Sequence, residues 1–558
     1  MTLTLEEAAT VARTALWWTG VRGDDAMLDH QWEGACFGAS AGRFILGDEP
    51  GLGKTRQVIA WADLVGAERV LCIVPREVCS QFAGEFEEYS DRVVVNLSNL
   101  TKSERHRQMR DAMENASVIV VNYEIARQDK EIATLMREWQ ADAMIVDEAH
   151  NIKTTSTAAF KFVAGLVLAD NECPNCGGYI EGVSFMHHGK KLPLPCPHCN
   201  DVPLYHAEQL RDLDKVLVTK SVKYLALVTG TPLLNTPDDL YSLLHLVDPD
   251  LFPSLAQYRR QFCALNHWED KYEFRQGALR ALHYLIEPVF IARTAEDAGV
   301  VIPTNRVHIV EFAQDRDTYG AQFRIMRRIT EEAQVRLDSG EQFTIMHALA
   351  LLTRKRQAVV YPAGITIKDR TGEVVLRVDV EESQKMDVLI ENVLAHRDRR
   401  QVVFSQFAEP LVALQKRLID HGLRVARLDG STTDKAAQEI KDNFYRAKGE
   451  EPKWDVVVVN YKKGGVGLNL TAATVTHILD EEWNPGKRDQ AYGRSSRYGQ
   501  IDETDTFVYR MQKSVDTYIA RIIRKKEDML DTFATGKSVV GGLLSREDLS
   551  KAMREGEL

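Results

Sequence analysis

The sequence is poor in features that would each point to a particular class of protein. It has no run of about 18 apolar residues, so no membrane-spanning helix is expected. Its N-terminus carries Glu6 and Glu7 and no basic segment, which argues against a secretory signal. Basic residues are not in excess, because 70 lysines and arginines against 81 aspartates and glutamates give a net charge of −11. Any nucleic-acid surface must therefore be a local groove.

Cysteine is also scarce, with 8 in 558 residues, which excludes a disulfide-stapled secreted fold. Four of them nevertheless form two C-x2-C pairs separated by 19 residues. Four thiolates at this spacing satisfy a tetrahedral Zn²⁺, so we predict a structural zinc site in an insert over residues 170–215. Free cysteines are the alternative. We therefore expect the protein in a reducing compartment, the cytoplasm, with the nucleus as the alternative. The predicted zinc ligands are Cys173, Cys176, Cys196 and Cys199.

What the sequence does contain is a glycine-rich loop, residues 47–55, between an apolar run and a helical pattern. The N–H groups of such a loop surround phosphate oxygens, and the helix N-terminus adds a favourable dipole. Lys54 is expected to reach the β- and γ-phosphates of ATP, and Thr55 to hold Mg²⁺. The strict pattern has glycine where Asp48 stands, and a simple glycine turn is the alternative. The predicted ATP-binding residues here are Asp48, Glu49, Pro50, Gly51, Leu52, Gly53, Lys54 and Thr55.

Continuous apolar runs separated by helical patterns predict parallel sheets covered on both faces. In such sheets the chemistry lies beyond the carboxyl ends of the strands. The run 144–146 leads directly into Asp147-Glu148-Ala149-His150. Asp147 is therefore expected beside the Mg²⁺, with Glu148 accepting a proton from the attacking water. The expected strands of the first half cover 44–46, 70–74, 117–121, 144–146 and 225–228.

Two further pairs of residues are ambiguous when each is read alone. The amide of Gln31, after His30, can both donate to and accept from an adenine edge, but a surface glutamine is the better reading in isolation. Arg494 and Arg497 are three positions apart and share a helix face. They fit arginine fingers on the γ-phosphate, with two solvated helix arginines as the alternative.

The set of motifs resembles one family, the Swi/Snf-type ATPases of helicase superfamily two. The resemblance runs from Leu28 to about Lys526 and implies an α/β fold with two RecA-like parallel-sheet lobes, Mg²⁺ with ATP, and double-stranded DNA as partner. It also implies ATP-site roles for Gly465 and Gln490. The family usually has tryptophan where Gln81 stands. Beyond the motifs above, the matching segments are Thr229–Pro232, Arg356–Pro362, Phe404–Phe407, Asp429–Ser431, Gly464–Leu470, Asp480–Pro485 and Gln490–Gln500.

The expected organisation follows from this resemblance and from the second set of apolar runs, which begins near Lys385. The short flanks favour a compact motor from a bacterial or viral setting. We expect lobe one over 1–300, the zinc insert within it at 170–215, a helical and hairpin bridge over 301–383, lobe two over 384–512 and a helical brace over 513–558.

The leading hypothesis is an ATP-dependent double-stranded DNA translocase or remodeller, with the zinc insert as an added grip on DNA or on a protein partner. One alternative is a strand-separating helicase on DNA or RNA. Another is a zinc-dependent binding module that uses ATP only as a conformational switch. Stimulation of ATP turnover by duplex separates the first from the second, and absence of stimulated turnover favours the third.

Overall fold

In the computed structural model the chain forms two compact units, and each is described by itself. Within the described part of the chain, the first unit runs to Val300 and the second begins after it. Within the described residues, no helix combines the length and apolar character needed to cross a membrane. The described residues are 27–168, 184–187, 190–192, 215–217, 222–230, 237–266, 271–275, 277–300, 303–338, 345–368, 374–444, 452–461, 470–482, 488, 500 and 502–524.

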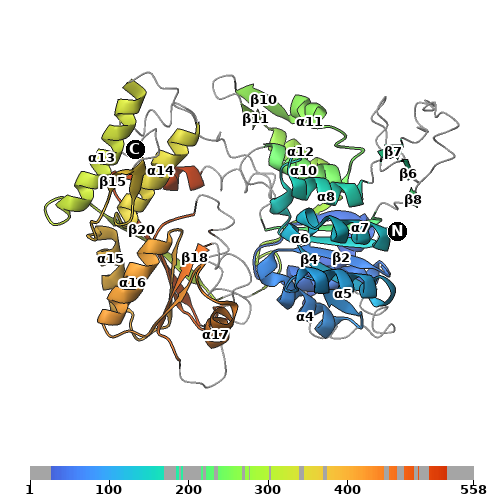
Figure 1. Ribbon diagram of the computed structural model, residues 1–558, viewed down its shortest axis with the longest axis horizontal. Coiled ribbons are helices and arrows are strands. Elements are labelled where there is room, and N and C mark those ends of the chain that lie inside the picture. The colour runs from blue at the N-terminus through green and yellow to red at the C-terminus, as the bar shows by residue number, and fades with distance from the viewer. Residues whose placement is uncertain are drawn as a thin grey trace. The chain divides into compact units, whose positions relative to one another are not determined.

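A parallel sheet forms the centre of the first unit, and Figure 1 labels its strands β2 and β4. The strand order is β12-β1-β9-β5-β2-β4-β3. Every residue of β2 and β4 is buried, as continuous apolar runs predict for a sheet with both faces covered. All five expected strands of this half are confirmed, and the structure adds the short β3 and β12. The strands are β1 (Arg43–Leu46), β2 (Val70–Val74), β3 (Val94–Asn96), β4 (Val118–Asn122), β5 (Ala143–Asp147), β9 (Tyr224–Val228) and β12 (Phe290–Ile291).

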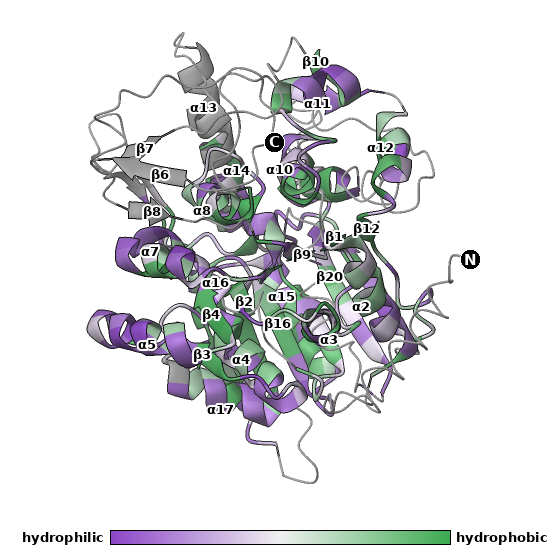
Figure 2. Cartoon of the chain, turned by 90° about the vertical axis from the view of Figure 1, so that its right-hand side faces the viewer, coloured by the Kyte–Doolittle hydropathy of each residue, from purple (hydrophilic) through white to green (hydrophobic). Residues whose placement is uncertain are grey.

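Helices cover both faces of this sheet. On one face, α2 (Asp29–Ala41), α3 (Lys54–Leu64) and α4 (Cys79–Tyr89) bury Trp32, Trp61 and Phe86 against the strands. Helices α6, α8 and α10 lie over the other face (Figure 1). Figure 2 shows the contrast in hydropathy between the green strands β2 and β4 and the purple helix α5. The other helices are α5 (Lys102–Asn115), α6 (Tyr123–Gln128), α7 (Lys130–Trp139), α8 (Ala158–Val167), α10 (Pro237–Val247), α11 (Leu255–Phe262) and α12 (Ala278–Ile286).

The segment between β5 and β9 contains the predicted insert at 170–215, of which the structure describes three short strands. Strands β6 (Ser184–His187), β7 (Lys190–Leu192) and β8 (Lys215–Leu217) form a small antiparallel sheet in the order β7-β6-β8. The hairpin β6–β7 lies in sequence between the two C-x2-C pairs. The four predicted zinc ligands, Cys173, Cys176, Cys196 and Cys199, lie outside the described residues.

The second unit contains a parallel sheet with strand order β13-β20-β19-β16-β18-β17. Its alternate residues pack against α15 and α16 on one face and α17 on the other. The α/β fold with two RecA-like parallel sheets is thereby confirmed. The elements are β13 (Asn305–Phe312), β16 (Gln401–Ser405), β17 (Val425–Leu428), β18 (Val456–Asn460), β19 (Val475–Ile478) and β20 (Thr504–Met511), with α15 (Gln384–Ala395), α16 (Ala408–Asp420) and α17 (Asp434–Phe444).

One strand of this sheet comes earlier in the chain than expected. The sheet was expected to begin near Lys385, but β13 pairs in parallel with β20 over its whole length. Because β13 lies at the sheet edge and four of its first five residues are exposed, it lacks the continuous apolar run that marks a central strand. The region before Lys385 otherwise contains α13 (Gly320–Asp338), α14 (Ile345–Val360) and the expected hairpin, formed by β14 (Thr366–Lys368) and β15 (Val374–Arg377).

Candidate nucleotide-binding site

The glycine-rich loop connects β1 to α3, as its sequence predicts. Gly53 is the N-cap of α3 and has φ 70°, a left-handed conformation that glycine adopts without steric cost. A Cβ at Gly53 would lie 2.2 Å from Nε2 of Gln31, so the loop also needs glycine because α2 approaches it closely. The predicted strand, loop and helix of a phosphate-binding site are therefore present together.

Lys54 points back along this loop. Its Nζ donates to the carbonyl oxygens of Asp48, at 2.7 Å, and Glu49, at 3.1 Å. The next residue, Thr55, hydrogen-bonds to Glu85 of α4, a carboxylate whose pKa is raised by burial. Glu85 was not predicted from the sequence, because nothing in its local pattern distinguishes it from a surface residue of an amphipathic helix.

Strand β9 brings the next two motifs alongside the loop. It lies between β1 and β5, and Val228 is in register with both Leu46 and Asp147. Beyond Val228, the Thr229 N–H donates to the Leu46 carbonyl oxygen at 3.0 Å. A Cβ at Gly230 would lie 3.8 Å from the Asp48 carbonyl oxygen. The described part of the Thr229–Pro232 motif thus lies between the phosphate loop and the DEAH segment, as expected for neighbouring parallel strands.

The electrostatics at the end of β5 suit a divalent cation. Burial raises the pKa of Asp147 above its ordinary range, and the negative charge of Glu148 raises it further, while Lys54 opposes both. Carboxylate and hydroxyl oxygens are the donors that Mg²⁺ takes from proteins. Asp147 ends β5, and Thr55 lies at the start of α3, after the loop that follows β1. Both residues supply such oxygens, so they fit the expected metal.

Glu148 has an unusual backbone for a glutamate, with φ 50° and ψ 50° in the left-handed region. Neighbouring groups hold this turn. The Tyr123 hydroxyl donates to the Asp147 carbonyl oxygen at 2.5 Å, and the Asn151 N–H and side-chain amide donate to the Glu148 carbonyl oxygen at 2.9 and 3.0 Å. His150 Nδ1 lies 3.1 Å from Oε2 of Glu148. A strained residue held by several bonds is typical of a functional position.

His30 and Gln31 are buried at the start of α2 and face the phosphate loop. His30 Nε2 lies 3.0 Å from the Leu52 carbonyl oxygen, and Gln31 Nε2 donates to the same oxygen at 3.4 Å. Gln31 Oε1 accepts from the Leu28 N–H at 3.1 Å. The motif is therefore joined directly to the loop, and its role in selecting the base stays a prediction.

Asp48, which stands where the strict pattern has glycine, is fully buried and pairs with Arg293 at 2.7 Å. Arg293 was not predicted, because 245 residues separate it from Asp48. The aspartate in place of the loop glycine was a signal that could have indicated such a partner, because a buried carboxylate inside a phosphate loop requires a cationic or donor group.

The second unit brings together part of its own predicted motifs. Arg356 donates to Gln406 Oε1 at 2.9 Å and lies 3.6 Å from the Asp480 carboxylate. Arg510 holds Glu481 with two bonds, at 2.7 and 2.9 Å. The predicted ATP-site residues Gly465, Gln490, Arg494 and Arg497 lie outside the described residues.

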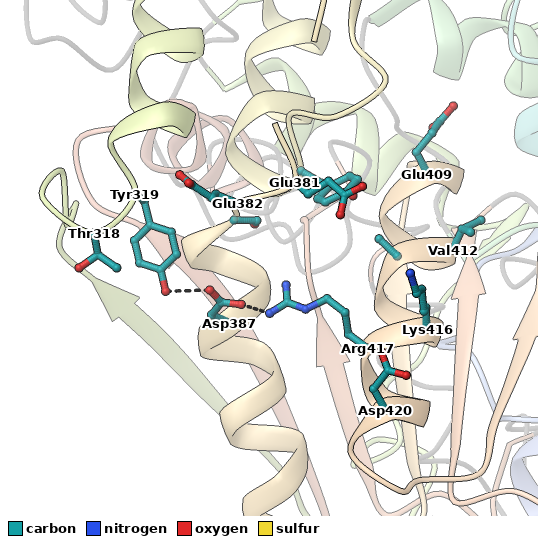
Figure 3. A pocket seen from close by; sticks show the side chains of 13 residues that line it. Thr318, Tyr319, Glu381, Glu382, Asp387, Glu409, Val412, Lys416, Arg417 and Asp420 are labelled. Atoms are coloured by element: carbon teal, nitrogen blue, oxygen red, sulfur yellow. Dashed lines mark hydrogen bonds and ion pairs between the residues drawn. The ribbon is translucent and has the colours of Figure 1, made fainter. Parts of the chain in front are cut away.

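A separate hollow of about 860 Å³ opens beside α15 and α16 (Figure 3). Asp387 lies between the Tyr319 hydroxyl, which donates to it at 2.8 Å, and the guanidinium of Arg417. None of the predicted ATP-binding or catalytic residues lines this hollow, so it is not the nucleotide site.

Comparisons with known proteins agree with this arrangement of motifs. The family model "SNF2-related domain" matches residues 30–170 and 209–363, and "Helicase conserved C-terminal domain" matches 384–499. Chromatin remodeling factor mit1 of Schizosaccharomyces pombe is 24% identical over 92% of this chain and 33% of its own. Chromodomain-helicase-DNA-binding protein 1-like of Mus musculus is 26% identical over 86% of this chain and 47% of its own.

A solved structure, "Sulfolobus solfataricus SWI2/SNF2 ATPase core in complex with dsDNA", covers 91% of this chain and 93% of its own at 20% identity, with TM-score 0.36. The chain spans less than half the length of the two curated relatives above. Because the SNF2-related domain model matches more than half of the residues, the chain belongs to the SNF2-related ATPase family of helicase superfamily two.

Proposed function

We propose that this protein is an ATPase that moves along double-stranded DNA and uses the movement to remodel or displace bound protein. One observation carries the proposal. In a chain of the SNF2-related family, the phosphate loop and the DEAH segment follow strands β1 and β5, which are both in register with β9. That register supports a single site for Lys54, Asp147 and Glu148 at the carboxyl ends of these strands.

Each group at this edge has a proposed part in hydrolysis. The loop N–H groups and Lys54 bind the phosphates, and Asp147 and Thr55 hold Mg²⁺. When bound, the metal neutralises phosphate charge. Glu148 orients the attacking water and takes its proton, while Tyr123 and Asn151 keep the backbone of Glu148 in place. His30 and Gln31 are proposed to contact the base.

The contribution of the second unit is proposed from its motifs. Arg494 and Arg497 act as arginine fingers on the γ-phosphate, and Gly465 and Gln490 complete the ATP site. The division into lobes at 1–300 and 384–512, with the bridge at 301–383 and the brace at 513–558, is proposed with them.

The proposed track is duplex DNA, held through its phosphates. The names of the curated relatives, a chromatin remodeling factor and a DNA-binding helicase, support this choice. Because the protein has a net charge of −11, its DNA contacts must be concentrated in a local basic groove. Binding is then weakly sequence-specific and falls steeply with salt.

We also propose that the insert at 170–215 binds one structural Zn²⁺ through its four cysteines. Two observations support this site. The antiparallel hairpin β6–β7 lies in sequence between the C-x2-C pairs, so it turns the chain back between them. The SNF2-related domain model matches 30–170 and 209–363, and the interval that it leaves out contains all four cysteines. The insert is proposed as a grip on DNA or on a protein partner.

The function is tested by steady-state ATP turnover of the full chain with duplex DNA, single-stranded DNA, forked DNA and RNA. We expect duplex DNA to stimulate turnover most. Lys54→Ala should abolish turnover with every nucleic acid, because the phosphates lose their bound charge. Stimulation far greater by RNA than by duplex DNA would overturn the proposal.

A further inference from the structure

We propose that Arg293 is a positioning residue for the phosphate loop and that Asp48 replaces the loop glycine in order to accept its guanidinium. This inference rests on the proposed binding of ATP at the loop. It assigns to the end of the first unit, just after β12, a part in nucleotide binding that no motif of the sequence indicates.

All five N–H donors of Arg293 have acceptors near the loop. Nε and Nη2 bind the two carboxylate oxygens of Asp48, at 3.2 and 2.7 Å, in the forked geometry that only arginine provides. Nη2 also donates to Gln57 Oε1 of α3 at 2.9 Å. Nη1 donates to the His30 carbonyl oxygen at 2.6 Å and to Glu33 Oε2 at 3.2 Å, both in α2. One side chain therefore joins the loop, α2 and α3.

The carboxylate of Asp48 is satisfied just as fully. Besides the two guanidinium bonds, Oδ1 accepts from the Arg293 N–H at 3.0 Å and Oδ2 accepts from Gln57 Nε2 at 3.0 Å. Asp48 is completely buried and Arg293 is 11% exposed. Both charges lie away from water, so each depends on the other and on these bonds.

The cluster leaves no room for rearrangement on the α2 side. A Cβ at Gly34 would lie 1.9 Å from Gln57 Oε1 and 2.8 Å from Nη2 of Arg293. The absence of a side chain at Gly34 therefore allows the helix to approach the two groups that hold Asp48.

Backbone bonds extend this contact along the start of the loop. The Gly47 N–H donates to the Ile291 carbonyl oxygen at 2.7 Å, and the Glu49 N–H donates to the Arg293 carbonyl oxygen at 2.9 Å. Glu49 Oε2 accepts from the Ala295 N–H at 2.9 Å. The first three residues of the loop are thus fixed to the segment 291–295.

These fixed residues are the ones that Lys54 contacts, because its Nζ donates to the carbonyl oxygens of Asp48 and Glu49. Arg293 therefore determines where the lysine and the turn from Gly51 to Gly53 lie before ATP arrives. A binding site held in place in advance loses less entropy when its ligand binds. A loosened loop should bind phosphate more weakly even when every loop residue is present.

The test compares full-length wild type with Arg293→Lys and Asp48→Asn. Lysine keeps the charge but has three donors at one nitrogen, so it cannot bridge Asp48, α2 and α3 at once. Asparagine keeps the shape of Asp48 and loses its charge. Arg92→Lys is the matched control, because Arg92 pairs with Asp63 at 2.7 Å at the far end of α3 and is 14% exposed. The measurements are the Kd for MgATP, kcat and KM for ATP, the Kd for duplex DNA without nucleotide, and Tm.

We expect Arg293→Lys to raise the Kd and KM for ATP by about 10²-fold, the scale of a misplaced binding group, and Asp48→Asn to raise them about tenfold. DNA affinity should stay within about twofold of wild type for both, and Arg92→Lys should match wild type in ATP affinity. Both variants binding ATP as wild type does would overturn the inference. A fall in DNA affinity as large as the fall in ATP affinity, together with a lower Tm, would also overturn it, because a general structural role would then explain the data. If wild type itself does not bind ATP, both the proposed function and this inference are overturned. The wild-type measurement alone distinguishes that result from failure of the inference.

Discussion

At the scale of single residues, Glu148 joins a left-handed backbone to a carboxylate at the end of a buried parallel strand. Glycine is the usual residue in this conformation, and a glutamate there costs about 1–3 kcal/mol. The bonds from Tyr123 and Asn151 to the neighbouring carbonyl oxygens hold the turn against that cost.

Replacing Glu148 with glutamine should retain ATP binding and stop hydrolysis, because an amide cannot accept the proton of the attacking water. A nucleotide-binding assay and single-turnover hydrolysis measure the two effects separately. Lys54→Ala is the companion variant, in which we expect binding itself to fail. Normal turnover by Glu148→Gln would remove this residue from the role of general base.

The Tyr123 hydroxyl gives a second prediction at this scale. Tyr123→Phe removes one bond to the Asp147 carbonyl oxygen and leaves the aromatic ring in the core. Because the DEAH turn then has one fewer restraint, we expect kcat to fall about tenfold while KM for ATP changes little. Steady-state kinetics at saturating duplex DNA measure this split. A rise in KM with unchanged kcat would contradict the proposed role of the hydroxyl.

A buried histidine in the second unit predicts how stability depends on pH. His477 is fully buried in β19, 2.7 Å from Gln401 Oε1 and 2.7 Å from the Tyr509 hydroxyl. Burial lowers the pKa of His477 from 6.5 to about 3. Between these two pKa values the unfolded chain binds a proton at His477 and the folded chain does not. The contribution of buried His477 to the free energy of unfolding is therefore complete above pH 6.5 and is lost as the pH falls toward 3.

We expect His477→Gln to lower the free energy of unfolding at pH 7.5 and to reduce its decline between pH 7.5 and 4.5. Urea titrations of the full chain, followed by fluorescence at each pH, measure the free energy of unfolding of wild type and variant. Wild type and variant with the same pH dependence would show that other groups account for acid destabilisation.

At the scale of elements, a strand or motif was predictable from the sequence when its signal lay in neighbouring residues. Central strands such as β2 and β4 were predictable because burial on both faces requires an unbroken apolar run. The edge strand β13 was missed because its exposed face mixes Arg306 and His308 with apolar residues. The phosphate loop and the DEAH segment were predictable because their chemistry is local in sequence. Arg293 and Glu85 were not, because only the fold brings them to the loop.

The insert is the element with the most separable role. Replacing residues 170–215 with a short Gly-Ser linker should leave basal ATP turnover intact, since the excursion leaves and rejoins the sheet between β5 and β9. DNA affinity or partner binding should weaken if the hairpin between the cysteine pairs is a grip. One zinc per chain should be lost with it, as measured by elemental analysis. Unchanged binding of DNA and partners would contradict the grip, and loss of basal turnover in a folded variant would assign the insert to the active site.

At the scale of the whole molecule, the chain forms two parallel-sheet units, and within the described residues the first unit ends at Val300, shortly after the segment that Arg293 ties to the phosphate loop. The net charge of −11 opposes nonspecific attraction to DNA. The proposed ATP-driven motion on duplex DNA therefore requires a local basic track on this chain. We propose that this motion follows the duplex, in contrast to the strand-separating helicase that the sequence left as an alternative.

A triplex-displacement assay tests that claim most directly. A fluorescent third strand is bound to one end of a linear duplex, and its release is followed in the presence of ATP. We predict ATP-dependent release by wild type, no release by Glu148→Gln, and no strand separation on a matched forked duplex. Separation of the forked duplex without release of the third strand would contradict the account and identify a strand-separating helicase instead.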